Sequence, residues 1–168
     1  MWPEKKTCVF ISYAFSNEKN TETDTVNKEF LQWYIGGIVE VLKAKWIVAW
    51  HSLIPEEDAI ISKLPYDDAI RYCTDAMTLL HENHALTILS VLKYPWTYTH
   101  HDMVEALPST WMKREFAHAQ QLGIPRIVAA QAWLETHEGL IPYFTDTDAS
   151  FVSFIDLTDL FEQVDRLW

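Results

Sequence analysis

The segment TCVFISY at residues 7–13 decides the fold class. It is a short run of apolar, β-branched and aromatic residues between polar segments, which is typical of a strand buried on both faces. Three further short apolar runs follow along the chain, at residues 46–50 (WIVAW), 85–91 (ALTILSV) and 125–130 (PRIVAA). We therefore expect four strands, with residues 7–13 in a central position.

Amphipathic helices are predicted between and after these strands. Apolar residues recur at helical spacing in four segments, residues 26–42, 66–80, 109–122 and 157–167. Gly36 and Gly37 weaken the first helix without cancelling it. Ser109 is a candidate N-cap of the third helix, and Gly123 is well placed as its C′ residue.

Two segments are predicted to lie outside this regular pattern. Pro55 and the acidic residues 56–58 indicate a solvated loop. Residues 93–108 are polar and aromatic without a clear period, and we interpret them as an insertion that is a candidate lid. Strands that alternate with helices indicate an α/β fold with a doubly wound, mainly parallel sheet, whose ligands bind beyond the carboxyl ends of the strands.

Composition excludes several classes of partner. A chain of 168 residues has room for one domain of ordinary size. Its 24 Asp and Glu against 13 Lys and Arg give a net charge of −11, which repels nucleic acids and anionic membrane surfaces. Two cysteines, no apolar signal core and no run of roughly 20 apolar residues predict a cytoplasmic protein.

Glu115 is the candidate catalytic residue that the helical pattern singles out. At 100° per residue, five mainly apolar side chains fall within about 60° of it, those of Trp111, Met112, His118, Ala119 and Leu122. A carboxyl group on this face points to the sheet or to a cleft above it, where burial raises its pKa and suits it to acid–base or charge-stabilising work. The alternative is a glutamate at the helix margin that arginine or backbone donors satisfy.

Two sequence boxes resemble those of TIR domains. VFISYAFSNE at residues 9–18 is similar to the opening strand and polar loop of that family. STWMKRE at residues 109–115 resembles the later pattern S-x-W-x-x-x-E, which likewise precedes a helix and an Ile-Pro strand such as 124–130. Residues 140–142 and 151–167 also look like a TIR ending, so the resemblance covers essentially residues 1–168 as one domain. The nearest members are the stand-alone TIR-like proteins of bacterial Thoeris antiphage systems.

The resemblance implies a fold and an activity. It implies a flavodoxin-like TIR fold and an NAD glycohydrolase or ADP-ribosyl cyclase, with NAD as substrate and no cofactor. Glu115 of the W-x-x-x-E box would be catalytic. The product would be an ADP-ribose-type signal, linear or cyclic, which activates a separate antiphage effector protein, and the enzyme would be able to form a homo-oligomer.

Five residues are candidates for substrate binding. Ser12, Tyr13 and Phe15 end or follow the first strand, Trp50 ends the second, and Trp111 belongs to the W-x-x-x-E box. The aromatic rings among them would stack on the bases of the substrate. The alternative for each aromatic residue is a purely structural role.

Two other functions remain open from the sequence. CTDAMTLL at residues 73–80, with Glu115 and Gly123–Pro125, also resembles nucleoside 2-deoxyribosyltransferases, in which Asp75 would end a loop before a strand. The helical period of residues 66–80 argues against that strand and places Asp75 on the polar face. The third candidate is a non-catalytic TIR module that acts by self-association.

Many TIR domains carry their catalytic glutamate on the helix before the fourth strand. Here that helix offers only aspartates before Glu82, namely Asp67, Asp68 and Asp75. Whether one of them assists Glu115 stays open.

Metal and serine-hydrolase chemistry are not expected. The histidines within residues 81–84 and 100–102 lack a third ligand at a defined spacing. Ser12, Ser90 and Ser109 have no nucleophile-elbow context such as G-x-S-x-G.

Overall fold

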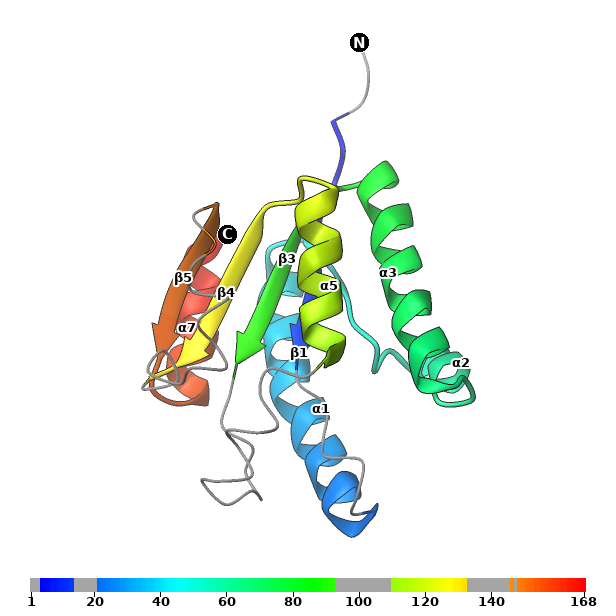
Figure 1. The fold of residues 1–168 in the computed structure, drawn as a ribbon. Helices are drawn as coiled ribbons and strands as arrows, with labels where there is room; N and C mark the ends of the chain where they lie inside the picture. The colour runs from blue at the N-terminus through cyan, green and yellow to red at the C-terminus, as the bar shows by residue number, and fades with distance from the viewer. Residues whose placement is uncertain (1–3, 14–20, 93–109, 133–145, 147) are drawn as a thin grey trace.

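The computed structural model describes residues 4–13, 21–92, 110–132, 146 and 148–168 (Figure 1). They form a sheet of five parallel strands in the order β2-β1-β3-β4-β5. The strands are β1 (Thr7–Tyr13), β2 (Val48–Trp50), β3 (Ala85–Leu92), β4 (Arg126–Gln131) and β5 (Ala149–Phe154). The helices are α1 (Thr21–Ala44), α2 (Pro55–Ile61), α3 (Tyr66–Asn83), α5 (Thr110–Gln121) and α7 (Leu157–Leu167). The predicted doubly wound, parallel α/β fold is confirmed.

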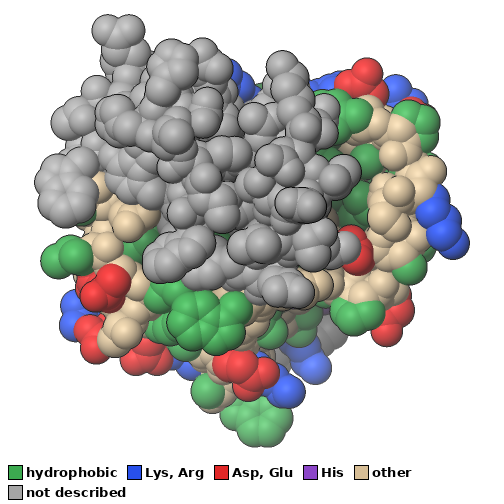
Figure 2. Space-filling view, turned by 90° about the horizontal axis from the view of Figure 1, so that it is seen from below, with side chains coloured by type: hydrophobic (Ala, Val, Ile, Leu, Met, Phe, Trp, Pro, Cys, Tyr) green, Lys and Arg blue, Asp and Glu red, His purple; other side chains and the backbone are tan. Residues whose placement is uncertain are grey.

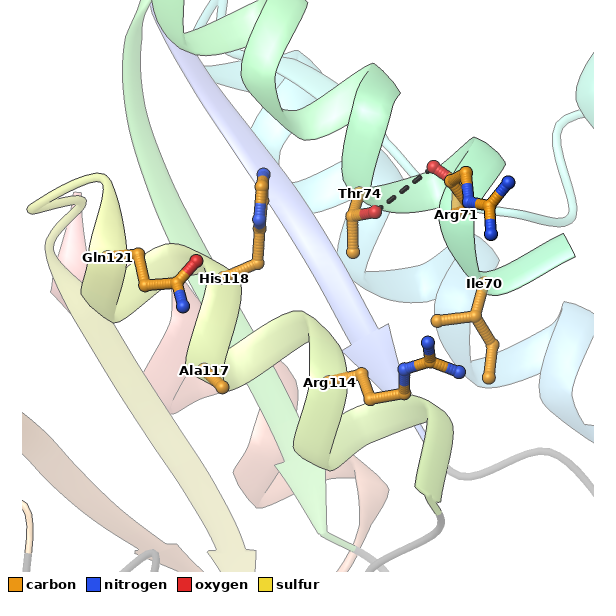
Figure 3. Close-up of a pocket in the computed structure, with 7 residues that line it drawn as sticks. All are labelled: Ile70, Arg71, Thr74, Arg114, Ala117, His118 and Gln121. Carbon is orange, nitrogen blue, oxygen red and sulfur yellow. Dashed lines mark hydrogen bonds between the residues drawn. The ribbon is translucent and has the colours of Figure 1, made fainter. Parts of the chain in front are cut away.

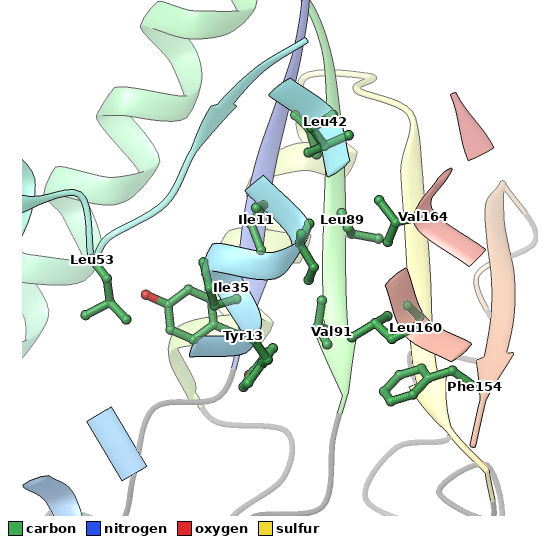
Figure 4. Close-up of a cluster of buried hydrophobic side chains, with 14 residues drawn as sticks. Ile11, Tyr13, Ile35, Leu42, Leu53, Leu89, Val91, Phe154, Leu160 and Val164 are labelled. Atoms are coloured by element: carbon green, nitrogen blue, oxygen red, sulfur yellow. The ribbon is translucent and has the colours of Figure 1, made fainter. Parts of the chain in front are cut away.

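Helices cover both faces of the sheet. In Figure 1, α3 and α5 lie on one face, with α2 beside α3, and α1 and α7 lie on the other. The side chains of β1 alternate between the two layers. Val9, Ile11 and Tyr13 pack with α1 and α7 (Figure 4), whereas Cys8 and Phe10 pack with α2, α3 and α5. This double burial explains why residues 7–13 are continuously apolar.

Helix α1 approaches α7 closely at a glycine. A Cβ atom on Gly37 would overlap the ring of Phe161 in α7, whereas a Cβ on Gly36 would meet nothing within 4 Å. Gly37 therefore allows the two helices to pack on the shared face of the sheet, and the helix predicted for residues 26–42 is confirmed and begins earlier, at Thr21.

Three sequence expectations need correction. Pro55 and residues 56–58 form the first turn of α2, not a loop, because proline is suited to the start of a helix and acidic side chains interact favourably with the helix dipole there. The second strand covers only Val48–Trp50 of the predicted 46–50. Strand β5 was not predicted, because its sequence, ASFVSF, lacks a strong apolar run. Ser109 and the candidate lid at 93–108 lie outside the described residues.

Two helices end in the same motif with different residues at its key position. After α5, Ile124 N–H donates to the Ala119 carbonyl and Gly123 N–H to that of Gln120, both at about 3 Å, which is a Schellman motif with Gly123 at φ +69°. The C′ role predicted for Gly123 is confirmed. After α1 the same pair of bonds places Trp46 in the left-handed region, with φ 62°. Trp46 is 94% exposed, so no burial offsets this strain.

Trp46→Gly is therefore expected to stabilise the protein. A left-handed conformation costs a residue with a Cβ atom about 1 kcal/mol or more, and glycine avoids this cost. We expect the free energy of unfolding to rise by about 1 kcal/mol in a denaturant titration. Gly123→Ala is the matched control and should lower it by a similar amount. Loss of stability in Trp46→Gly would show that the exposed indole makes a contact that outweighs the strain.

Candidate active site

The carboxyl group of Glu115 is buried between α5 and the sheet. Helix α5 packs against β1, β3 and β4, and its Glu115 points inward with only 3% of its surface exposed. The Ser12 hydroxyl of β1 donates a hydrogen bond of 2.8 Å to Glu115 Oε1. Glu115 therefore faces the sheet, as the helical pattern predicts, and does not lie at the helix margin.

Burial shifts the acid–base equilibrium of this group. Loss of solvent raises the pKa of Glu115 from 4.5 to about 8, and hydrogen bonds from Ser12 and Trp111 offset only part of that effect. No arginine or lysine pairs with Glu115 in the described part of the chain. Most molecules consequently carry a neutral Glu115 at pH 7, and the ionised form becomes the major one above about pH 8.

The site lies where the winding of the sheet reverses. The chain leaves β1 through α1 to reach β2 on one side, then crosses through α2 and α3 to β3 on the other side. Ser12 on β1 and Ser90 on β3 are register partners at this switch point, close to the carboxyl ends of both strands. Those ends point downward in Figure 1, and Figure 2 views the molecule from that edge. Open parallel sheets bind their ligands at this place.

The structure brings three of the predicted site residues together. Ser12 and Trp111 both hydrogen-bond Glu115, and Trp111 also makes an edge-to-face contact with Tyr66, with ring centroids 5.9 Å apart. Trp50 belongs to the same apolar cluster as Trp111.

The other predicted binding residues are placed differently. The ring of Trp50 stacks on Phe10 with centroids 4.7 Å apart and is 8% exposed, so it is part of the core. Tyr13 lies on the opposite face of the sheet from Ser12, and its hydroxyl forms a 2.6 Å hydrogen bond with the Ser52 hydroxyl. Phe15 lies outside the described residues.

The acidic residues of α3 are not part of the buried site around Glu115. Asp67, Asp68 and Asp75 are all exposed. Asp67 pairs with Arg114 at 2.9 Å, and Asp68 approaches Arg71 at 3.9 Å. An assisting role for these aspartates has no support in their positions.

Sequence reasoning missed several groups near the carboxyl edge or beside Glu115. Ser90, considered only as a hydrolase nucleophile, is fully buried opposite Ser12. The alternation of side chains along β3, together with the β1–β3 pairing, would have identified Ser90.

Two further groups were missed. Burial and the nearby Glu115 raise the pKa of the Cys73 thiol, which keeps it protonated. Burial lowers the pKa of His51, directly after β2, to about 4, and its Nδ1 accepts a 3.2 Å bond from the N–H of Leu53.

A separate groove of about 320 Å³ lies between α3 and α5 (Figure 3). Arg71 and Thr74 of α3 and Arg114 and His118 of α5 are among its lining residues, and Glu115 is not. His118 Nε2 lies 2.7 Å from the Thr78 hydroxyl, and Arg114 is engaged by Asp67. These polar contacts join the two helices, so we assign the groove a structural role.

Among the described residues, no group of three or more His, Cys, Asp or Glu side chains is arranged to hold a metal ion. Within the same part of the chain, no helix has the length and apolar character to cross a bilayer.

No protein-family model matches the chain, and no curated protein is significantly similar to it in sequence.

Glu115→Gln is expected to stabilise the fold in a pH-dependent way. The unfolded chain releases the Glu115 proton near pH 4.5, whereas the folded protein retains it up to about pH 8, so stability falls as the pH rises between these values. Above that window the full cost is present, on the order of 5 kcal/mol. Glutamine carries no charge and avoids this cost. Thermal unfolding should therefore show a small gain for the variant at pH 5 and a larger gain at pH 9.

The control for this measurement is Glu162→Gln, which removes an exposed carboxyl group on α7. Its stability should follow the pH dependence of the parent protein. Parallel curves for Glu115→Gln and the parent would contradict the raised pKa of Glu115.

Proposed function

We propose that this chain cleaves the N-glycosidic bond between ribose and nicotinamide in NAD, with Glu115 as the catalytic residue. The observation that carries the proposal is the buried carboxyl group of Glu115, which has no cationic partner in the described part of the chain and lies at the β1–β3 switch point. A buried carboxyl group without a cation costs stability, which is typical of groups retained for chemistry.

The physical chemistry of the bond favours such a residue. When the bond between C1′ and the nicotinamide nitrogen breaks, its electron pair stays on nitrogen, so nicotinamide leaves as a neutral molecule. C1′ then develops oxocarbenium character, which the ionised form of Glu115, the minor form at pH 7, stabilises strongly in its apolar surroundings. Attack by water forms a new C1′–O bond and releases one proton, which gives ADP-ribose. Attack by the adenine ring of the same molecule, again with loss of a proton, gives a cyclic product.

The choice of NAD rests on the resemblance of residues 9–18 and 109–115 to TIR domains. The same resemblance supports a signalling role, in which the product activates a separate effector protein of a bacterial antiphage system. It also supports self-association of the enzyme. NAD is a substrate in this proposal, and no cofactor is required.

The structure weighs against the two alternatives. A deoxyribosyltransferase-like site would need a strand after Asp75, but residues 66–83 form the single helix α3 and Asp75 is exposed on it. A module that acts only by self-association has no need of a buried carboxyl group, whose removal would stabilise it.

Glu115→Gln is expected to abolish NAD cleavage in a folded protein. The variant keeps the shape of the side chain but loses the charge that stabilises the oxocarbenium ion, so the turnover rate should fall about 100- to 1000-fold. Products are measured by mass spectrometry after incubation of concentrated protein with NAD or with a deoxynucleoside mixture. Asp75→Asn is the matched control and should cleave NAD at the rate of the parent.

The other outcomes separate the alternatives. Cleavage of deoxynucleosides alone, with loss of activity in Asp75→Asn, would identify the deoxyribosyltransferase-like enzyme. Equal NAD cleavage by the parent and Glu115→Gln would contradict the proposed mechanism.

A further inference from the structure

The hydroxyl group of Ser90 is buried and has no hydrogen-bond partner among the described residues. Ser90 has no exposed surface, and its Oγ makes no hydrogen bond to the described residues. An unsatisfied buried hydroxyl costs free energy, and folded proteins leave few such groups. A residue that carries this cost in a central strand calls for an explanation.

The position of Ser90 supplies one. On the face of the sheet under α5, the register pairs Phe10 with Ile88 and, two residues further along, Ser12 with Ser90. The large apolar side chains of Phe10 and Ile88 are therefore followed, on the same face, by the two small serine side chains just before the carboxyl ends of β1 and β3. Neighbouring strands lie about 4.8 Å apart, so Ser90 is one strand spacing from the serine that binds Glu115.

Ser12, Ser90 and Glu115 differ in the hydrogen bonds that they can still form with a ligand. Ser12 donates its only hydroxyl hydrogen to Glu115 Oε1. Ser90 retains both its donor and its acceptor capacity towards the described residues. A carboxyl group and a free hydroxyl on adjacent elements match the two neighbouring oxygen atoms of a vicinal diol.

We propose that Ser90 is a specificity-determining residue that binds one hydroxyl of the ribose diol of the ligand, while Glu115 binds the other. The proposal rests on the proposed function and adds that the substrate class is ribosides and not deoxyribosides. A site that hydrogen-bonds a substrate hydroxyl discriminates against an analogue that lacks it, because the buried group of the protein then stays unpaired.

The test compares binding of three ligands by calorimetry. They are ADP-ribose and its two analogues that lack the 2-hydroxyl or the 3-hydroxyl of the terminal ribose. Ser90→Ala should bind ADP-ribose about tenfold more weakly than the parent does, the value of one hydrogen bond. It should bind one of the two analogues with unchanged affinity, which identifies the hydroxyl that Ser90 contacts. Ser150→Ala, at an exposed serine of β5, should bind all three ligands like the parent.

Stability provides the second readout. Because Ser90 Oγ has no partner among the described residues, Ser90→Ala should melt at or above the melting temperature of the parent. A lower melting temperature would show that a bound water or another group satisfies the hydroxyl, and it would overturn the proposal. An equal loss of affinity for all three ligands, or no loss for ADP-ribose, would also overturn it.

Failure of the proposed function gives a different result. If the parent binds ADP-ribose but does not cleave NAD, the proposed reaction is wrong, while the comparison of ligands still tests Ser90. If the parent does not bind ADP-ribose, the assignment of Ser90 is overturned whether or not NAD is cleaved.

Discussion

The constraint on which the site depends is the burial of the Glu115 carboxyl group with no cationic partner in the described part of the chain. A partly buried carboxyl group in the same protein shows the contrast. Asp146 accepts a 2.7 Å bond from Arg126, and this pairing lowers its pKa. Among the described residues, Glu115 has only the neutral donors Ser12 and Trp111, and burial raises its pKa to about 8. The pairing of Asp146 with Arg126 stabilises the folded chain, whereas the unpaired Glu115 is a reactive group that lowers stability.

The fold explains how such a group is held in place. Strand β1 is buried on both faces, so its even-numbered residues are fixed under α5 and its odd-numbered residues under α1 and α7. The β1–β3 pairing sets Ser12 beside Ser90, and α5 places Glu115 above them. Each group comes from a different element, and all lie at the point where parallel sheets of this order leave room for a ligand.

Local patterns in the sequence predict the parts of this arrangement that depend on periodicity. The inward direction of Glu115 follows from the 100° step of its helix, and the end of that helix follows from Gly123. Predictions from local patterns are wrong where the same residue type occurs in two kinds of structure, or where an unusual residue type occupies a position. Pro55 starts a helix as readily as it marks a loop, and Trp46 occupies a position that glycine usually holds. The pairing of Ser12 with Ser90 depends on strand register, which no local pattern contains.

The most direct test of the central claim is the pKa of Glu115 itself. Carboxyl carbons of ¹³C-labelled glutamate are followed by NMR as the pH is raised, and the Glu115 signal is assigned by its loss in Glu115→Gln. We expect a midpoint near pH 8 for Glu115. A midpoint below pH 5 would show that Glu115 is solvated or paired with a cation, and it would contradict the buried carboxyl group of raised pKa on which the proposed function rests.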